Sequence, residues 1–277
     1  MKLTLVNSAD QVFEAVGRVK ANAPAFCTNF FPVQSKLERW IWNAELSLQV
    51  CDSAAFFLRR DRDFWRLYFC AARADALQSE IGTLSVLRSE PVVLDVLGKE
   101  SALASWGDCF APAGLRPYSR LQRMGRIPAP GSPIAEAPAE VSVTAASTGD
   151  AVSILALLED LFDQFADQLP ELHEIEAAIG NQQVLTVKSN GSLAAALFFE
   201  TQGLTSSIRF WAVSKQFQSR HFGAALMRTY FSLHHAVRRF NLWVAVDNQN
   251  AVQKYQHYGY SADGLLDLIL VNERIRS

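Results

Sequence analysis

Apolar and polar positions follow the same order twice along this 277-residue chain. Each half begins with helical spacing, continues with three apolar runs typical of an antiparallel meander, and then alternates helix and strand. In the first half we expect helices near 35–45, 75–87 and 100–110, and strands at 46–50, 54–60, 64–72 and 91–98. In the second half we expect helices over 151–168, 222–239 and 250–258, and strands at 182–187, 192–200, 206–213, 242–246 and 265–271. The repetition predicts a duplicated α/β unit with a mixed sheet.

The segment "RIPAPGSPIAEAPAE", residues 126–140, interrupts this periodicity. It holds four prolines with Gly, Ala and Ser, a composition typical of a linker. We therefore expect one domain at 1–125 and another at 141–277.

Composition narrows the classes of partner. The net charge of −2 provides no basic surface of the kind that nucleic-acid binding requires. No stretch approaches the roughly 20 apolar residues of a membrane span, and the N-terminus turns polar too early for a signal peptide, so we expect a cytoplasmic protein. The four cysteines have no CxxC spacing and lie in the half without histidines, so we expect free thiols and no metal site.

One polar loop occurs in the second half only. The stretch "VSKQFQSRHFGAALM", residues 213–227, leads from a strand into an amphipathic helix, whereas the first half continues as "RADALQSEIG" at the corresponding point. A helix start presents unpaired N–H groups and the positive end of the helix dipole, which suits a phosphate. Gly223 and the small residues after it would let a bulky ligand approach. The alternative is a plain strand–helix connection in which Gly223 serves packing.

A second stretch, "LWVAVDNQNAVQKYQHYGY" at residues 242–260, favours the ligand site over the plain connection. Together the two stretches resemble the GNAT superfamily of CoA-dependent N-acetyltransferases. The family pattern Asn-x-x-Ala-x-x-x-Tyr-x-x-x-Gly-(Phe/Tyr) is matched in full at Asn248, Ala251, Tyr255, Gly259 and Tyr260. The resemblance covers residues 141–270, and it extends to the first half through element order and the segment "FAPAGL" at 110–115. It implies two GNAT-like domains in tandem, of which the first is degenerate and lacks the acetyl-CoA loop.

The resemblance also implies an acyl-CoA site. In the family a strand valine precedes a (Gln/Arg)-x-x-Gly-x-(Gly/Ala) loop whose amides bind the pyrophosphate of acetyl-CoA. The corresponding residues here are Val213, Gln218, Ser219, Arg220, His221, Phe222, Gly223 and Ala224, joined by Asn248 and Ala251. His221 stands where the first loop glycine belongs; histidine adopts left-handed backbone more readily than branched residues do, so we expect the loop to survive. A register from Arg220 to Ala225 also fits the motif, but it lengthens the gap from Val213 by two residues.

The activity implied is direct transfer of an acetyl group from acetyl-CoA to an amine, without a metal. By resemblance, Tyr255 would protonate the departing thiolate. Asp247 and Glu200 are candidates for the base, a water relay is another, and each carboxylate is equally a solvated strand end. Arg209 and Trp211 either line the acceptor channel or pack.

Several alternatives stay open. The acidic stretch 159–176 either attracts a cationic amine or is the solvated face of an amphipathic helix. A donor with a longer acyl group and an acyl carrier protein are alternatives to acetyl-CoA, and binding of acyl-CoA without catalysis is an alternative to transfer. Because an internal duplication supplies a partner surface within one chain, we expect a monomer.

Overall fold

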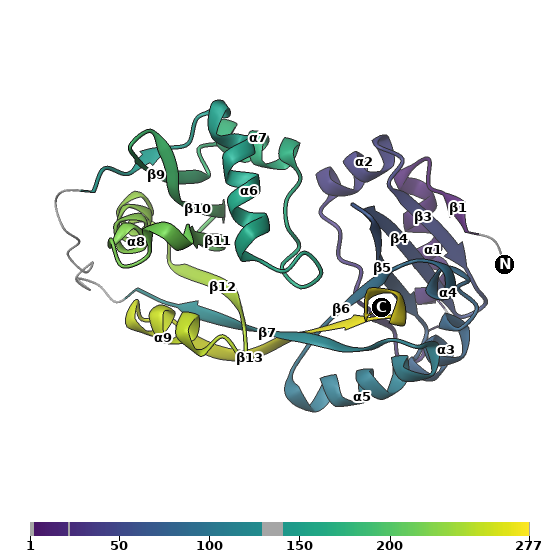
Figure 1. Ribbon diagram of the computed structural model, residues 1–277. Coiled ribbons are helices and arrows are strands. Elements are labelled where there is room, and N and C mark those ends of the chain that lie inside the picture. The colour runs from purple at the N-terminus through teal and green to yellow at the C-terminus, as the bar shows by residue number, and fades with distance from the viewer. Residues whose placement is uncertain (1–2, 22, 129–140, 277) are drawn as a thin grey trace. The chain divides into compact units, whose positions relative to one another are not determined.

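The computed structural model describes residues 3–21, 23–128 and 141–276 (Figure 1). Residues 129–140 of the expected linker lie outside this described part. The chain divides into two compact units: unit 1 comprises Met1–Leu121 with Gly264–Ser277, and unit 2 comprises Gln122–Asp263. Both are α/β units with a mixed sheet, as the sequence predicted.

Unit 1 has the strand order β1-β3-β4-β5-β6-β13, with β2 paired to β5. Neighbouring strands are antiparallel except for the parallel pair β5–β6. Its elements are β1 (Thr4–Leu5), α1 (Ala9–Ala21), β2 (Cys27–Thr28), α2 (Gln34–Trp42), β3 (Leu46–Val50), β4 (Ala54–Asp61), β5 (Phe64–Ala71), α3 (Ala74–Ile81), α4 (Val86–Ser89), β6 (Val92–Gly98), α5 (Glu100–Phe110), the first part of β7 (Arg116–Arg126), most of β13 (Ser261–Val271), and α10 (Glu273–Arg276).

The core of unit 1 lies on both faces of its sheet. Alternation along β4 turns Phe56 and Leu58 toward α3 and α5, and Phe57 toward α1 and α2. All three side chains are fully buried. This is why the strands of this half read as nearly continuous apolar runs.

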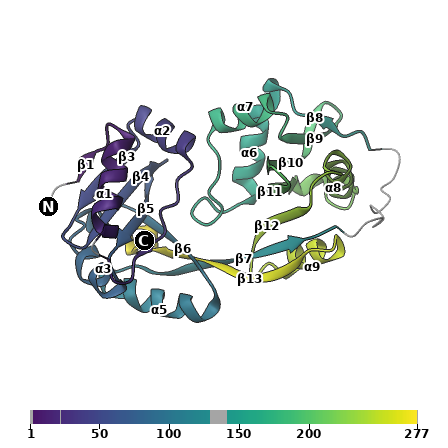
Figure 2. The ribbon, with the colours of Figure 1, turned by 180° about the vertical axis from the view of Figure 1, so that it is seen from behind.

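Unit 2 repeats the arrangement, with the strand order β8-β9-β10-β11-β12-β7. Helices α6 and α7 cover one face of the sheet, and α8 and α9 pack on the other (Figures 1 and 2). The elements are β8 (Thr144–Ala145), α6 (Ala151–Leu161), α7 (Leu172–Gly180), β9 (Val184–Ser189), β10 (Ser192–Gln202), β11 (Thr205–Val213), α8 (Phe222–Leu233), β12 (Arg239–Ala245) and α9 (Gln249–His257).

The last strand of each sequence half contributes to the unit formed mainly by the other half. Strand β7 ends the first half, but from Gln122 onward it belongs to unit 2, where β7 neighbours β12. Strand β13 ends the second half, yet Leu266–Val271 pair antiparallel with β6 in unit 1. The observed division therefore differs from the expected boundaries at 1–125 and 141–277. A segment of residues 141–277 alone would lack one strand of the unit 2 sheet.

Two expected helices end earlier than the periodicity of the sequence indicates. The helix expected over 151–168 ends at Leu161, where the carboxylate of Asp163 accepts the N–H groups of Phe165 and Ala166 and forms a turn. The helix expected to reach Arg239 ends at Leu233, and Arg239 instead begins β12. The second end coincides with a histidine that bonds a carbonyl of the last turn.

That histidine, His234, closes a hydrogen-bond network under α8. Its Nδ1 lies 2.7 Å from the carbonyl oxygen of Tyr230 and must carry the proton, because a carbonyl only accepts. Its Nε2, 3.0 Å from Thr201 Oγ1, accepts in the neutral ring. Thr201 and the hydroxyl of Tyr230 both contact Ser206, at 2.9 and 2.7 Å. Burial lowers the pKa of His234, so the folded state favours the neutral ring.

We expect this network to weaken in acid. Because the pKa of His234 is lower in the folded state, the unfolded chain binds the proton first as pH falls below about 6.5, and folding stability declines. His234→Gln should reduce the loss of melting temperature between about pH 7.5 and 5.5. The exposed neighbour provides the control: His235→Gln should keep the parent's pH dependence. An unchanged slope in His234→Gln would contradict the prediction.

Candidate active site

The parallel strands β11 and β12 separate midway along their length. Their pairing runs from Thr205–Arg239 to Ile208–Leu242 and stops there, whereas β11 continues to Val213 along β10. A bulge at Arg209 accompanies the separation, because Phe198 pairs with residue 210 while the next residue of β10 pairs with residue 208. Residues 209–213 of β11 therefore extend beyond the β12 pairing and present a backbone edge that an extended ligand can pair with.

The bulge also changes which side chains share a face. Ile208 packs with α8 and α9, Phe210 packs with α6 and α7, and Trp211 returns to the first face. Regular strand alternation would place Arg209 and Trp211 on one face, and the bulge interrupts it. Arg209 instead donates from Nη1 to Glu200 Oε1 at 2.7 Å.

The loop after β11 adopts the backbone that the family motif requires of a glycine. His221, the N-cap residue of α8, has φ 59° and ψ 12°, and Ser219 has φ 67°. The expectation that histidine would tolerate left-handed geometry is therefore met. Between Gln218 and Ala224 no backbone N–H donates a hydrogen bond within the described chain; the first bond of the helix comes from Ala225 to the His221 carbonyl. These N–H groups are available to an anion at the positive end of α8.

Gly223 faces protein rather than open space. A Cβ atom added to it would lie 2.9 Å from Cζ2 of Trp211 and 3.2 Å from Nε1 of the same ring. The indole Nε1–H also donates to the Gly223 carbonyl at 3.2 Å. The glycine is thus required for close approach between α8 and the Trp211 ring, which is the packing alternative raised by the sequence.

Tyr255 occupies the middle of this region. It lies on α9, is 8% exposed, and packs its ring 5.5 Å from Trp211 and 6.0 Å from Tyr260. Burial, reinforced by the carboxylate of Asp167, raises its pKa, so the phenol keeps its proton at neutral pH. The hydroxyl makes no hydrogen bond within the described chain, so its proton is available to a ligand.

Asn248 and Ala251 have a defined local role at the start of α9. The side-chain oxygen of Asn248 accepts the N–H of Ala251 at 3.1 Å, an N-cap that fixes the direction of the helix bearing Tyr255. The family pattern at these positions is therefore consistent with helix positioning.

The two candidate bases lie in different settings. Glu200 forms an ion pair with Arg209, and it pairs in the sheet with Ser207, about 17 Å along β10 from the partner of Val213 by strand rise. Asp247 is exposed in the turn that precedes α9. In the described part of the chain, neither carboxylate forms a hydrogen bond or ion pair with Tyr255 or with the loop.

Asp167 is the acidic residue that the sequence did not single out. The turn after α6 carries it to within electrostatic reach of Tyr255. Phe162 anchors this turn edge-on against Phe210 at 5.1 Å, and Lys215 of the loop donates to Asp160 at 2.9 Å. The only sequence signal was the acidic stretch as a whole, because the contact depends on where α6 ends.

Unit 1 has the same strand separation, but its own chain fills it. Strands β5 and β6 pair over only two residues of each, and Asn29 bridges them beyond that point. Its Nδ2 donates to the carbonyls of Leu67 on β5 (3.2 Å) and Asp95 on β6 (2.9 Å), while its Oδ1 accepts the Phe69 N–H at 2.7 Å. Only residues 72 and 73 separate β5 from α3, so unit 1 also lacks a loop of the unit 2 kind.

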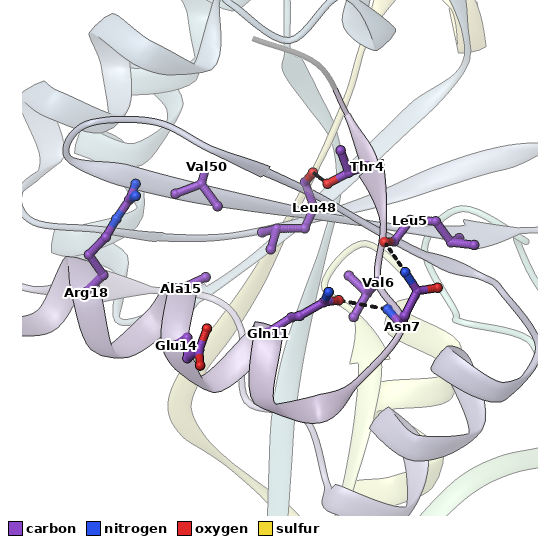
Figure 3. Close-up of a pocket in the computed structure, with 10 residues that line it drawn as sticks. All are labelled: Thr4, Leu5, Val6, Asn7, Gln11, Glu14, Ala15, Arg18, Leu48 and Val50. Carbon is purple, nitrogen blue, oxygen red and sulfur yellow. Dashed lines mark hydrogen bonds between the residues drawn. The ribbon is translucent and has the colours of Figure 1, made fainter.

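Unit 1 contains a pocket of about 510 Å³ between α1 and strands β1 and β3 (Figure 3). Its polar groups are largely engaged in local hydrogen bonds. Gln11 accepts the N–H of Asn7, Thr4 donates to the Leu48 carbonyl, and Arg18 donates to the Cys51 carbonyl. None of the residues singled out by the sequence lines it.

The described residues contain no group of three or more His, Cys, Asp or Glu side chains placed to hold a metal ion. The four cysteines form no disulfide. Among the helices described, none has the length and apolar character needed to cross a membrane.

Comparison with known proteins agrees with this geometry. Residues 153–260 match the family model described as the acetyltransferase (GNAT) family. A GCN5-related N-acetyltransferase from Sphaerobacter thermophilus superposes with a TM-score of 0.63 at 14% identity, covering 98% of this chain and 95% of that one. A tandem GNAT protein from the clavulanic acid biosynthesis pathway gives 0.57 at 12% identity, with 98% and 97% covered. A probable N-acyltransferase from Enterococcus faecalis V583 gives 0.57 at 10% identity, with 98% and 72% covered.

At these identities the superpositions establish the fold. No curated protein matches the sequence. The family match falls on the unit that contains the separated strands, the left-handed loop and Tyr255, and the structural likenesses extend over nearly the whole chain. The chain therefore carries a domain of the GNAT acetyltransferase family at residues 153–260 and folds as two GNAT-like units in tandem.

Proposed function

We propose that unit 2 is an acyltransferase that moves an acetyl group from acetyl-CoA to the nitrogen of an amine. The observation that carries this proposal is the separation of β11 from β12 beside a helix start whose N–H groups have no acceptor in the described chain. The separated strand suits an extended pantetheine arm, and the helix start suits the pyrophosphate. Val213, at the end of β11, joins these two parts.

The proposed reaction is a direct attack. The neutral amine nitrogen forms a bond to the thioester carbon, the carbon–sulfur bond breaks, and Tyr255 gives its proton to the departing thiolate. The proton that the nitrogen loses as the amide forms returns to the Tyr255 phenolate, through water. Backbone N–H groups of the separated segment stabilise the negative charge on the carbonyl oxygen. The protein contributes mainly alignment of the two substrates. Because Glu200 is held by Arg209, we propose that water, or Asp247, receives the proton of the incoming ammonium.

We propose a small cationic amine as the acceptor. The turn after α6 brings Asp167 near Tyr255, and Asp163 belongs to the same turn. Carboxylates on this side of the site favour an ammonium group over a neutral or anionic one.

The alternatives were a longer acyl donor, an acyl carrier protein, and a binder without catalysis. The carrier protein was considered because His221 replaces a loop glycine. His221 adopts the left-handed backbone, so the replacement of glycine no longer argues against a pyrophosphate site. We therefore prefer acetyl-CoA as the donor. In unit 1, Asn29 occupies the strand separation, so we propose a single acyl-CoA site for each chain.

Calorimetric titration of the full chain with acetyl-CoA tests this function. We expect one saturable site, retained within about threefold by His221→Gly, because glycine accepts a φ of 59° without strain. His221→Val should weaken binding by about tenfold, since a branched residue is strained there by about 1–3 kcal/mol.

Each result discriminates between the readings. Binding by His221→Gly without binding by the parent would mean that the natural loop holds no pyrophosphate, and would favour a carrier protein or a non-catalytic role. Two sites per chain would contradict the proposed closure of unit 1. The full chain is used because residues 141–277 lack the β7 strand of unit 2.

A further inference from the structure

Trp211 lies on the separated part of β11, three residues beyond the last pair with β12. Its ring packs against the apolar cluster that also contains residues of α8, α9 and β12. The ring centroid is 5.5 Å from Tyr255 and 5.8 Å from Tyr258, both on or at the end of α9. The indole therefore adjoins the residue proposed to protonate the sulfur.

The indole is fixed in this position from the other side as well. Its Nε1–H donates to the Gly223 carbonyl at 3.2 Å, and the α-carbon of Gly223 packs so closely that even a methyl group would overlap the ring. A ring held by a hydrogen bond at one edge and by two aromatic contacts elsewhere cannot turn aside without losing these interactions. It fills the space between the first turn of α8 and α9.

We infer that Trp211 sets the length of the acyl group that the site accepts, and restricts it to a short chain. The inference rests on the proposed function, because it takes the thioester to lie at the Tyr255 hydroxyl. The indole packs with its centroid 5.5 Å from that of the Tyr255 ring, so we place an acyl group attached to a sulfur at this hydroxyl beside the indole. Each added methylene must then displace a ring that the surrounding helices hold in place, and overpacking of this kind is unfavourable.

The test is a comparison of dissociation constants for acetyl-, butyryl- and octanoyl-CoA, measured by calorimetry on the full chain. Binding is measured because it needs no acceptor amine. For the parent we expect octanoyl-CoA to bind more than about tenfold more weakly than acetyl-CoA. In Trp211→Leu this ratio should fall to about threefold or less, and in Trp211→Phe it should be intermediate.

Phe210→Leu is the matched control. Phe210 is the adjacent aromatic residue of the same strand, is more deeply buried than the half-buried Trp211, and packs on the opposite face against Phe162. This variant should lose a similar amount of stability and keep the parent's ratio. Circular dichroism and melting temperature confirm that each variant is folded.

The outcomes separate this inference from the function on which it rests. If the parent binds octanoyl-CoA as tightly as acetyl-CoA, or if folded Trp211→Leu and Trp211→Phe both keep the parent's ratio, Trp211 does not set chain length although the acyl-CoA site stands. If the folded parent binds none of the three donors, the proposed function fails, and the inference fails with it.

Discussion

We expect Tyr255→Phe to lower kcat for the proposed acyl transfer by about 100-fold and to leave the affinity for acetyl-CoA unchanged within about twofold. The ring contacts with Trp211 and Tyr260 survive in phenylalanine, so packing is preserved and only the proton donor is lost. Because the hydroxyl has no hydrogen-bond partner in the described chain, its removal leaves no buried group unsatisfied. Thiol release from acetyl-CoA, measured with acceptor amines, gives kcat, and calorimetry gives the affinity.

The pH dependence follows from the same residue. An acid is active while it is protonated, and burial together with the Asp167 carboxylate raises the pKa of Tyr255. We therefore expect no loss of parent activity from Tyr255 ionisation up to about pH 10, the ordinary value for tyrosine.

Tyr258→Phe is the matched control for this test. Tyr258 follows α9, is half-buried, and also packs against Trp211. Removing its hydroxyl should change kcat by less than about twofold. Parent-like turnover in Tyr255→Phe would show that another group protonates the thiolate, and equal losses in both variants would show that the effect is one of packing.

The sequence predicted the strands of unit 2 well because their signals are local. Apolar runs bounded by turn residues at 184–189, 192–202 and 205–213 each form a strand close to its expected position. Helix ends were less predictable, since they depend on single side chains. Asp163 accepts two backbone N–H groups in the turn that follows α6, and His234 donates to a carbonyl at the end of α8. Periodicity continues past both points, so it gives no sign of either helix end.

Strand exchange had no signal in the sequence at all. The apolar positions of β7 and β13 do not indicate which strand each one pairs with, so only the pairing partner distinguishes the two arrangements. By contrast, α1 was predictable: Val12, Ala15 and Val19 recur at helical spacing and are buried. That segment was considered only as a signal peptide.

The candidate site divides in the same manner. The loop and Tyr255 could be proposed from the sequence because the family pattern consists of residue types at fixed spacings. The contact between Trp211 and Gly223 could not be predicted. From the sequence, Trp211 was interpreted as a channel or packing residue and Gly223 as a glycine near a ligand, without a connection between them. Likewise, nothing in the sequence of unit 1 indicates that Asn29 bridges its two strands.

We expect Gly223→Ala to lower the free energy of unfolding by about 1–3 kcal/mol and to weaken the proposed acetyl-CoA binding by about tenfold or more. The direction opposes helix propensity, which favours alanine over glycine by about 1 kcal/mol within a helix. The cause is the Trp211 ring: the new Cβ would lie 2.9 Å from Cζ2, so either the ring or the start of α8 must move. Both movements disturb the N–H groups proposed to hold the pyrophosphate. Thermal unfolding and calorimetric titration measure the two effects.

Gly180→Ala separates this steric cause from a general effect of alanine. Gly180 is the last residue of α7 in the same unit, and a Cβ added there meets no atom within 4 Å. We expect its stability to be unchanged or slightly raised. The double variant Gly223→Ala with Trp211→Leu completes the argument, because removing the indole removes the overlap. The double variant should then be more stable than the sum of the single effects by about 1 kcal/mol. If the effects of the two substitutions on the free energy of unfolding were strictly additive, the Trp211 indole would not be the reason for a glycine at position 223. The contact between the two residues would then not shape the site as proposed.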